Sequence, residues 1–198
     1  MINVFYKIFG LRKIILLFQK LLFLLFYGKY FNLSTKIFGL PIISFVRGSK
    51  IKIGKKLVLI SASYFSEPGI NHEVIIRTLT KDAELIIGDN VGISGGGICC
   101  AKKVVIGNNV MFGANAFVTD TDFHPINPEN RRFTKEGTGF SPVIIEDNVF
   151  LGMNVLVLKG VRIGKNSVIA AGSVVTSDIP ENVIAGGIPA KVIKRINS

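Results

Sequence analysis

The sequence is poor in the residues that build metal centres and disulfide frameworks. Among 198 residues it has two cysteines, Cys99 and Cys100, and two histidines, His72 and His124. Adjacent cysteines do not easily bridge each other across one peptide bond, and this pair matches no metal-ligand spacing. Free thiols of this kind favour a reducing compartment. We therefore expect a cytoplasmic protein that binds no metal, with His72, which lies outside any motif, in a structural role.

Acidic residues are absent from the first part of the chain. The first one is Glu67, whereas 11 of the 24 lysines and arginines lie at or before Lys56. The remainder balances 13 basic against 13 acidic residues, so the net charge of +11 belongs to one segment. Because no aromatic-basic RNA motif and no helix-turn-helix pattern accompanies this charge, we expect no nucleic-acid partner.

The basic segment, residues 1–50, is also the most apolar part of the chain and is expected to be helical. On a helix, Arg12 and Gln19, like Lys13 and Lys20, lie seven residues apart, which gives one narrow polar stripe opposite a broad apolar face. Such a helix fits an anionic membrane surface, with lysine stems reaching toward the headgroups. A helix packed on the domain or in an oligomer interface is the alternative.

A membrane-spanning helix and a signal peptide both fit the residues of this segment less well. A span would place charged residues in the hydrocarbon core, at a cost of about 2.5–3.5 kcal/mol each when central. A signal peptide is disfavoured because Gln19 and Lys20 interrupt the apolar run and no small-residue cleavage site follows. We therefore expect peripheral membrane contact.

Apolar residues recur every six positions through the second half of the chain, which is the main evidence for its architecture. The unbroken hexads start at Ile145, Leu151, Val157, Ile163, Ile169 and Val175. A period of six fits neither an amphipathic helix nor a single strand, but it suits a short strand followed by a tight corner. Three such units make one triangular coil of 18 residues.

Stacked coils would place Ile145 against Ile163, Leu151 against Ile169 and Val157 against Val175. Asparagines at the corners, at positions 90, 109, 148 and 166, tolerate the left-handed backbone that corners need. The pattern predicts a β-helix prism over residues 51–180, with a closing segment at 181–198. The hexads stop between Val118 and Ile145, which predicts a projecting loop over residues 119–144 with His124 near its start.

From about Ile87 to Ile196 the sequence resembles the bacterial hexapeptide-repeat acetyltransferases, in the branch of galactoside, maltose and serine acetyltransferases and polysaccharide O-acetyltransferases. Three motifs carry the resemblance: Asp122-Phe-His124-Pro125, the hexads from Ile145, and Ala185-Gly-Gly-Ile-Pro189-Ala-Lys191. The resemblance implies a left-handed parallel β-helix. It also implies a homotrimer with active sites between neighbouring prisms, and acetyl-CoA as the acetyl donor.

The resemblance assigns expected roles to single residues. His124 would be the catalytic base, and the Gly152 N–H would stabilise the oxyanion. Ser94 stands where relatives often place an acceptor-binding asparagine, and Asp122 would bind the acceptor, orient the imidazole or cap a turn. The residues expected to contact CoA are Gly152, Met153, Ala171, Thr176, Lys191 and Lys194, of which the two lysines replace frequent arginines.

The expected function is transfer of an acetyl group to a sugar hydroxyl during synthesis of capsule, exopolysaccharide or lipopolysaccharide. The acceptor is inferred from the cationic, apolar segment 1–50, because membrane-linked sugars are assembled at the inner face of the cytoplasmic membrane. One alternative is a soluble acceptor, such as a free sugar, a nucleotide-linked amino sugar or serine. Another is a β-helix scaffold without activity, against which the motif at His124 argues.

Overall fold

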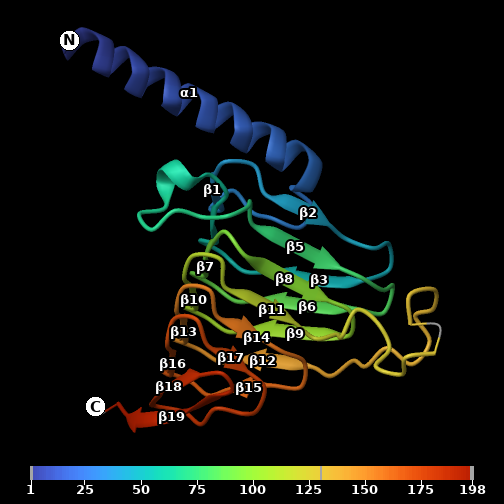
Figure 1. Ribbon diagram of the computed structural model, residues 1–198. Helices are drawn as coiled ribbons and strands as arrows, with labels where there is room; N and C mark the ends of the chain where they lie inside the picture. Colours follow the sequence, from blue (N-terminus) through green and yellow to red (C-terminus); the bar gives the residue numbers. More distant parts are fainter. Residues whose placement is uncertain (1, 130, 197–198) are drawn as a thin grey trace.

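The protein is a three-sided prism of stacked coils with one long helix at its N-terminal end (Figure 1). The computed structural model describes residues 2–129 and 131–196, with side chains from residue 14 onward. Each of the first five coils contributes one short strand to each of three sheets, and successive coils pair in parallel. The last two strands, β18 and β19, pair antiparallel.

The strands of each sheet follow one another at intervals of one coil. Sheet A contains β1 (Lys36–Phe38), β4 (Val58–Ile60), β7 (Gly92–Ser94), β10 (Met111–Phe112), β13 (Phe150–Leu151), β16 (Val168–Ile169), β18 (Val183–Gly187) and β19 (Ala190–Arg195). Sheet B contains β2 (Ile42–Ser44), β5 (Ile75–Thr78), β8 (Gly97–Cys100), β11 (Phe117–Thr119), β14 (Leu156–Val157) and β17 (Val174–Val175). Sheet C contains β3 (Lys50–Ile53), β6 (Glu84–Ile87), β9 (Lys103–Ile106), β12 (Val143–Ile145) and β15 (Arg162–Ile163). The other elements are α1 (Ile2–Tyr27) and a 3₁₀ turn, η1 (Ser63–Phe65).

The predicted stacking of the hexads is confirmed. Ile145 pairs with Ile163, Leu151 with Ile169, and Val157 with Val175. All six side chains are fully buried, so the inward positions form continuous apolar columns along the prism. Burying a side chain of this size stabilises the fold by roughly 1.5–3 kcal/mol relative to exposure, before the entropy cost of ordering the chain. The core is the interior of the prism.

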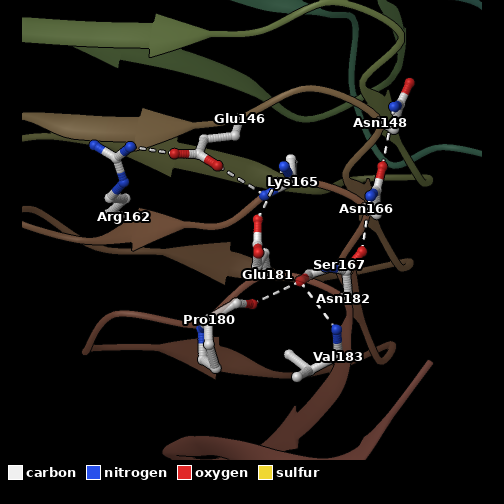
Figure 2. A network of polar contacts seen from close by, with 10 residues as sticks. All are labelled: Glu146, Asn148, Arg162, Lys165, Asn166, Ser167, Pro180, Glu181, Asn182 and Val183. Atoms are coloured by element: carbon white, nitrogen blue, oxygen red, sulfur yellow. Dashed lines mark hydrogen bonds and ion pairs between the residues drawn. The ribbon is translucent and has the colours of Figure 1, made fainter. Parts of the chain in front are cut away.

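One corner of the prism, between sheets C and A, is held by a column of asparagines. Asn90, Asn109, Asn148, Asn166 and Asn182 all have positive φ angles, between +56° and +63°. Each amide donates to the next one along the column, at 2.8–3.1 Å. Figure 2 shows the last part of the column beside the Glu146–Arg162 ion pair on the neighbouring face. Asparagine therefore supplies both the left-handed backbone and a bond between coils.

The prism begins earlier than the sequence predicts. Its first strand starts at Lys36, inside the segment 1–50 that was expected to be a helical appendage. Phe31, Ile37 and Ile43 are buried at intervals of six and form the first turn of the repeat. This repeat directly follows the apolar run of residues 21–27, so its period does not stand out from its surroundings.

The N-terminal end of the prism is covered by the C-terminal half of α1. Phe23 is buried, and its ring lies 4.8 Å from that of Phe31, edge to face. The Tyr27 hydroxyl donates to the Ile43 carbonyl at 3.2 Å. No helix in residues 2–129 and 131–196 combines the length and the apolar character that crossing a membrane requires.

The asparagine column allows backbone conformation and hydrogen bonding to be tested separately. Replacing Asn148 by glycine removes its side-chain bonds to Asn109 and Asn166 but keeps the left-handed backbone accessible. Replacing Asn148 by alanine removes the same bonds. It also makes the left-handed backbone conformation less favourable, which lowers the free energy of unfolding by a further roughly 1–2 kcal/mol. Urea unfolding should therefore rank Asn148→Gly above Asn148→Ala in stability by about 1 kcal/mol. Equal losses would show that the backbone conformation contributes nothing.

Candidate functional site

A loop leaves the prism at the corner between sheets B and C, where the six-residue period stops. The chain departs after β11 and returns at β12, as the hexads predict. The two ends of the loop are bound together, because Thr121 and Phe140 form an antiparallel bridge and the Asp122 N–H donates to the Gly139 carbonyl at 3.1 Å. This bound base fixes the direction in which the loop leaves the prism.

Asp120, at the start of the loop, binds the coil rather than a ligand. Its buried carboxylate accepts three backbone N–H groups, from Ala101, Lys102 and Lys103, each at 2.6 Å. A carboxylate that satisfies three buried donors is a strong structural contact. Asp120 therefore fixes the loop base to the preceding coil.

Phe123 and His124 follow the bound base. Phe123 has a φ angle of +63°, which a bulky L residue rarely adopts and which is common near functional sites. Its carbonyl accepts the Lys135 ammonium at 2.6 Å, which ties the two arms of the loop together. The next residue, His124, is exposed, and its imidazole makes no hydrogen bond within the described part of the chain. The geometry thus presents an accessible imidazole on a fixed backbone.

The predicted acceptor residue Asp122 is paired with a residue that the sequence did not single out. Its carboxylate lies 2.6 Å from the Lys159 ammonium, and both side chains are less than one-third exposed. Lys159 follows β14, on the next coil at the same corner. A Cβ on Gly139 would come within 2.5 Å of the Asp122 carboxylate, so the bare backbone there makes room for the pair. Asp122 therefore anchors the loop to the prism.

Several residues expected to contact CoA or acceptor lie at another corner, between sheets A and B. Ser94 ends β7, Gly152 and Met153 follow β13, and Ala171 follows β16. The coils are in close contact here, because a Cβ on Gly152 would lie 2.6 Å from the Ala171 nitrogen. Four predicted site residues are thus brought into one column by the coil register.

The expected oxyanion role of Gly152 does not fit its hydrogen bonding. Its N–H already donates to the Ile169 carbonyl at 2.8 Å, as part of the bonding between coils. The adjacent Met153 N–H, on an exposed corner, has no hydrogen-bond partner among residues 2–129 and 131–196. The sequence could not separate the two positions, because only the coil geometry decides which N–H bonds to the next coil.

The remaining predicted residues lie elsewhere on the prism. Thr176 is exposed after β17, at the corner between sheets B and C, on the coil after that of Lys159. Lys191 and Lys194 are exposed on β19, at the edge of sheet A. A single prism therefore does not gather all of the predicted site residues, because His124 and Met153 lie at different corners on either side of sheet B.

A cavity of about 380 Å³ lies where the loop base meets the prism, and sequence reasoning did not predict it. Phenylalanine rings, threonine hydroxyls and one ammonium group contribute to its wall. Its lining residues are Leu79, Thr80, Ala101, Thr121, Phe123, Lys135, Thr138 and Phe140. They come from sheet B corners and from both arms of the loop, so only the folded loop creates it. Within the described residues, no group of three or more His, Cys, Asp or Glu side chains is placed to hold a metal ion.

The two cysteines are buried beside Asp120 and should be unreactive. Burial, followed by the nearby Asp120 charge, raises the pKa of the Cys100 thiol to about 12, and burial also raises that of Cys99. A thiol stays protonated, and therefore unreactive, at pH values well below its pKa. We expect a thiol reagent at pH 8 to label neither cysteine in the folded protein and both in urea. Rapid labelling of the folded protein would contradict this assignment.

The contact between Asp122 and Lys159 should control how firmly the loop is held. Lys159→Met removes a partly buried ion pair worth about 1 kcal/mol, so trypsin should cleave the loop after Arg131 or Arg132 roughly fivefold faster. Asp122→Asn should act alike, and the double variant should add little to either. Lys165→Met is the matched control, since it breaks the Lys165–Glu181 pair on another corner. An equal effect in the control would contradict the local role.

Comparisons with known proteins identify the same regions. Residues 103–119 and 142–177 match the family pattern described as the hexapeptide repeat of succinyl-transferase. The galactoside O-acetyltransferase of Lactococcus lactis subsp. lactis (strain IL1403) is 54% identical over 95 residues, which are 48% of this chain and 44% of that protein. That of Escherichia coli (strain K12) is 47% identical over 95 residues, 48% of this chain and 45% of the relative. The match thus spans less than half the length of these curated relatives.

A solved structure extends the comparison to three dimensions. The crystal structure of a hexapeptide-repeat-containing acetyltransferase from Vibrio cholerae superposes with a TM-score of 0.52 at 31% identity. The superposition covers 62% of this chain and 64% of that one. Taken with the three-sided prism and its six-residue columns, these matches show that the chain has the left-handed parallel β-helix fold that the sequence resemblance implied, and that its hexads are similar to those of hexapeptide-repeat acetyltransferases.

Proposed function

We propose that this protein transfers the acetyl group of acetyl-CoA to a hydroxyl of a carbohydrate acceptor, with His124 as the general base. The observation that carries the proposal is the exposed His124 imidazole, held on a loop whose base is fixed by Asp120 and by the Asp122–Lys159 pair. The galactoside O-acetyltransferases share 47–54% identity with this chain over 95 residues. They support a sugar hydroxyl as the acceptor.

The reaction requires few groups, because a thioester is already activated and the alcohol is the poor partner. The His124 imidazole removes the hydroxyl proton as the oxygen attacks the thioester carbon. The tetrahedral oxyanion accepts a hydrogen bond from a backbone N–H, for which the unpaired Met153 N–H is the better candidate than Gly152. Collapse of the intermediate breaks the carbon–sulfur bond, and the imidazolium returns the proton to the departing thiolate.

We further propose that the active site forms between copies in a homotrimer. His124 and Asp122 lie at one corner of the prism, whereas Ser94, Met153 and Ala171 lie at another. A neighbouring prism could bring the second group to the loop of the first, which is the arrangement that the family resemblance implies. In this arrangement CoA lies along the corner column at Ala171 toward Lys191 and Lys194. The two lysines supply positive charge for its phosphates.

Two acceptor classes remain, and each has its own support. The cationic, apolar N-terminal segment favours sugars linked to lipid in capsule, exopolysaccharide or lipopolysaccharide synthesis, at the inner face of the cytoplasmic membrane. The names of the galactoside relatives favour a soluble sugar. We propose the membrane-linked class, because those relatives match less than half of their own length here.

The direct test compares His124→Ala with His72→Ala, its matched control at the only other histidine. Purified proteins receive acetyl-CoA with soluble sugars and detergent-solubilised lipid-linked oligosaccharides, and thiol release and product mass are followed. Loss of a general base should slow transfer at least about a hundredfold in His124→Ala and leave His72→Ala unchanged. Equal activity in both variants would refute the role of His124. Failure of the native chain to bind acetyl-CoA would favour the inactive scaffold.

A further inference from the structure

Helix α1 presents an apolar stripe on the face that points away from the prism. Ile14, Phe18, Leu21 and Leu25 recur every three or four residues and therefore lie along one line of the helix. Their side chains are 60–78% exposed. Phe23 and Tyr27, on the opposite side, pack against the first coil. The helix is thus apolar on the side that the protein covers and on the side that it leaves open.

The polar residues of this helix whose side chains are described do not lie on the outward face, as they would in an ordinary surface helix. Gln19 and Lys20 are only half-exposed, and the Lys20 ammonium donates to the Leu33 carbonyl at 2.9 Å. Leu17 and Phe26, 59% and 72% exposed, widen the outward stripe. An exposed apolar face of this width is normally covered by a partner or a membrane. The side chains of Arg12 and Lys13, expected in the same polar stripe, lie outside the described residues.

The charge around the stripe indicates what the partner is. Residues 1–56 carry 11 basic and no acidic residues, and those on the first coils, such as Lys29, Lys36, Lys52 and Lys55, are exposed. A second copy placed against this end would bring the same charge to the same face, which opposes association. An anionic lipid surface meets both demands, because it accepts apolar side chains and attracts the lysines.

A groove beside the stripe supports the same partner. It has a volume of about 590 Å³ and lies between the end of α1 and the first coil. Its lining includes the apolar side chains of Leu24, Phe31 and Leu33, and also Asn32, Ser34 and Lys55. An apolar groove with an ammonium group at its wall suits the upper part of a phospholipid, with its phosphate beside the lysine.

We propose that the outward stripe of α1 inserts into the headgroup and upper acyl region of a bilayer rich in anionic phospholipids. The helix then lies in the plane of the membrane. The proposal names the residues that make the membrane contact of the proposed function. It rests on that membrane contact and not on the reaction. Figure 1 shows α1 across one end of the prism and the β18–β19 pair at the other. The membrane therefore contacts the N-terminal end, and the loop stays on the flank of the prism.

The absence of tryptophan from the chain allows a direct test of insertion. Phe18→Trp places a single fluorophore on the stripe, and Phe133→Trp places one at a more exposed position on the loop, 84% against 61%. Vesicles of phosphatidylcholine containing roughly one-third phosphatidylglycerol should shift the Phe18→Trp emission to the blue and leave Phe133→Trp unchanged. Pure phosphatidylcholine vesicles should shift it much less. The absence of a shift with anionic vesicles would overturn the proposal.

Vesicle co-sedimentation of the full chain tests the stripe without a probe. Leu21→Gln with Leu25→Gln should lower the partition coefficient at least about tenfold, since two exposed leucines no longer enter the bilayer. Ile188→Gln removes a similarly exposed side chain, 75% open, near the far end of the prism and should leave binding unchanged. High salt should weaken binding of the native chain.

Two further outcomes separate this inference from its rivals. A Phe18→Trp emission that is already blue without lipid, together with a smaller assembly for the double glutamine variant, would show that a second copy covers the stripe and would overturn the proposal. Thiol release from acetyl-CoA with a soluble sugar is measured on the same proteins. If the native chain transfers acetyl groups but does not bind vesicles, the membrane proposal is overturned and the role of His124 is not. If the native chain binds vesicles but does not transfer acetyl groups, the proposed reaction is overturned and the membrane proposal is not.

Discussion

The structure depends on one constraint, the parallel pairing of each coil with the next in a fixed register. Parallel pairing satisfies the backbone N–H and C=O groups of a strand only when its neighbour has the same phase. That phase also places every sixth side chain inside the prism. In sheet A the result is an unbroken column from Ile37 through Leu59, Ile93 and Phe112 to Leu151. Any residue that alters the phase must therefore lie at a corner or outside the coil.

The same constraint leaves two open ends, which the chain closes in different ways. At the C-terminal end β19 pairs antiparallel with β18 and ends the parallel series. At the N-terminal end, the described residues before β1 form α1 and a turn, and Phe23 of α1 packs over the first coil. An exposed edge of a parallel series invites pairing with another chain, so both ends need a cover. The helix is thus required by the prism on its inner side, while its outer side remains available.

The sequence predicted the features that follow from the period and missed those that follow from position in space. Ile145 over Ile163 and the left-handed asparagines could be predicted, because an inward column and a tight corner each demand a residue type. The interruption after Val118 located the loop for the same reason. Lys159 could not be singled out, since it lies in a regular hexad and meets Asp122 only once the loop folds back. Nor could the sequence show that the Gly152 N–H is used between coils and the Met153 N–H is not.

The register also decides how a site can be built on this scaffold. A column at one corner places side chains of successive coils next to one another, as it does for Ser94, Met153 and Ala171, which we propose as the binding surface for a long, extended cofactor. This column stays at one corner of the prism, and sheet B separates it from the loop that carries His124. A reaction that needs both groups must therefore bring two prisms together along their length. Association through the flanks leaves the N-terminal ends of all copies free and facing the same way in a rotationally symmetric assembly. The outward stripes of α1 would then lie at one end of such an assembly, where several weak membrane contacts act together.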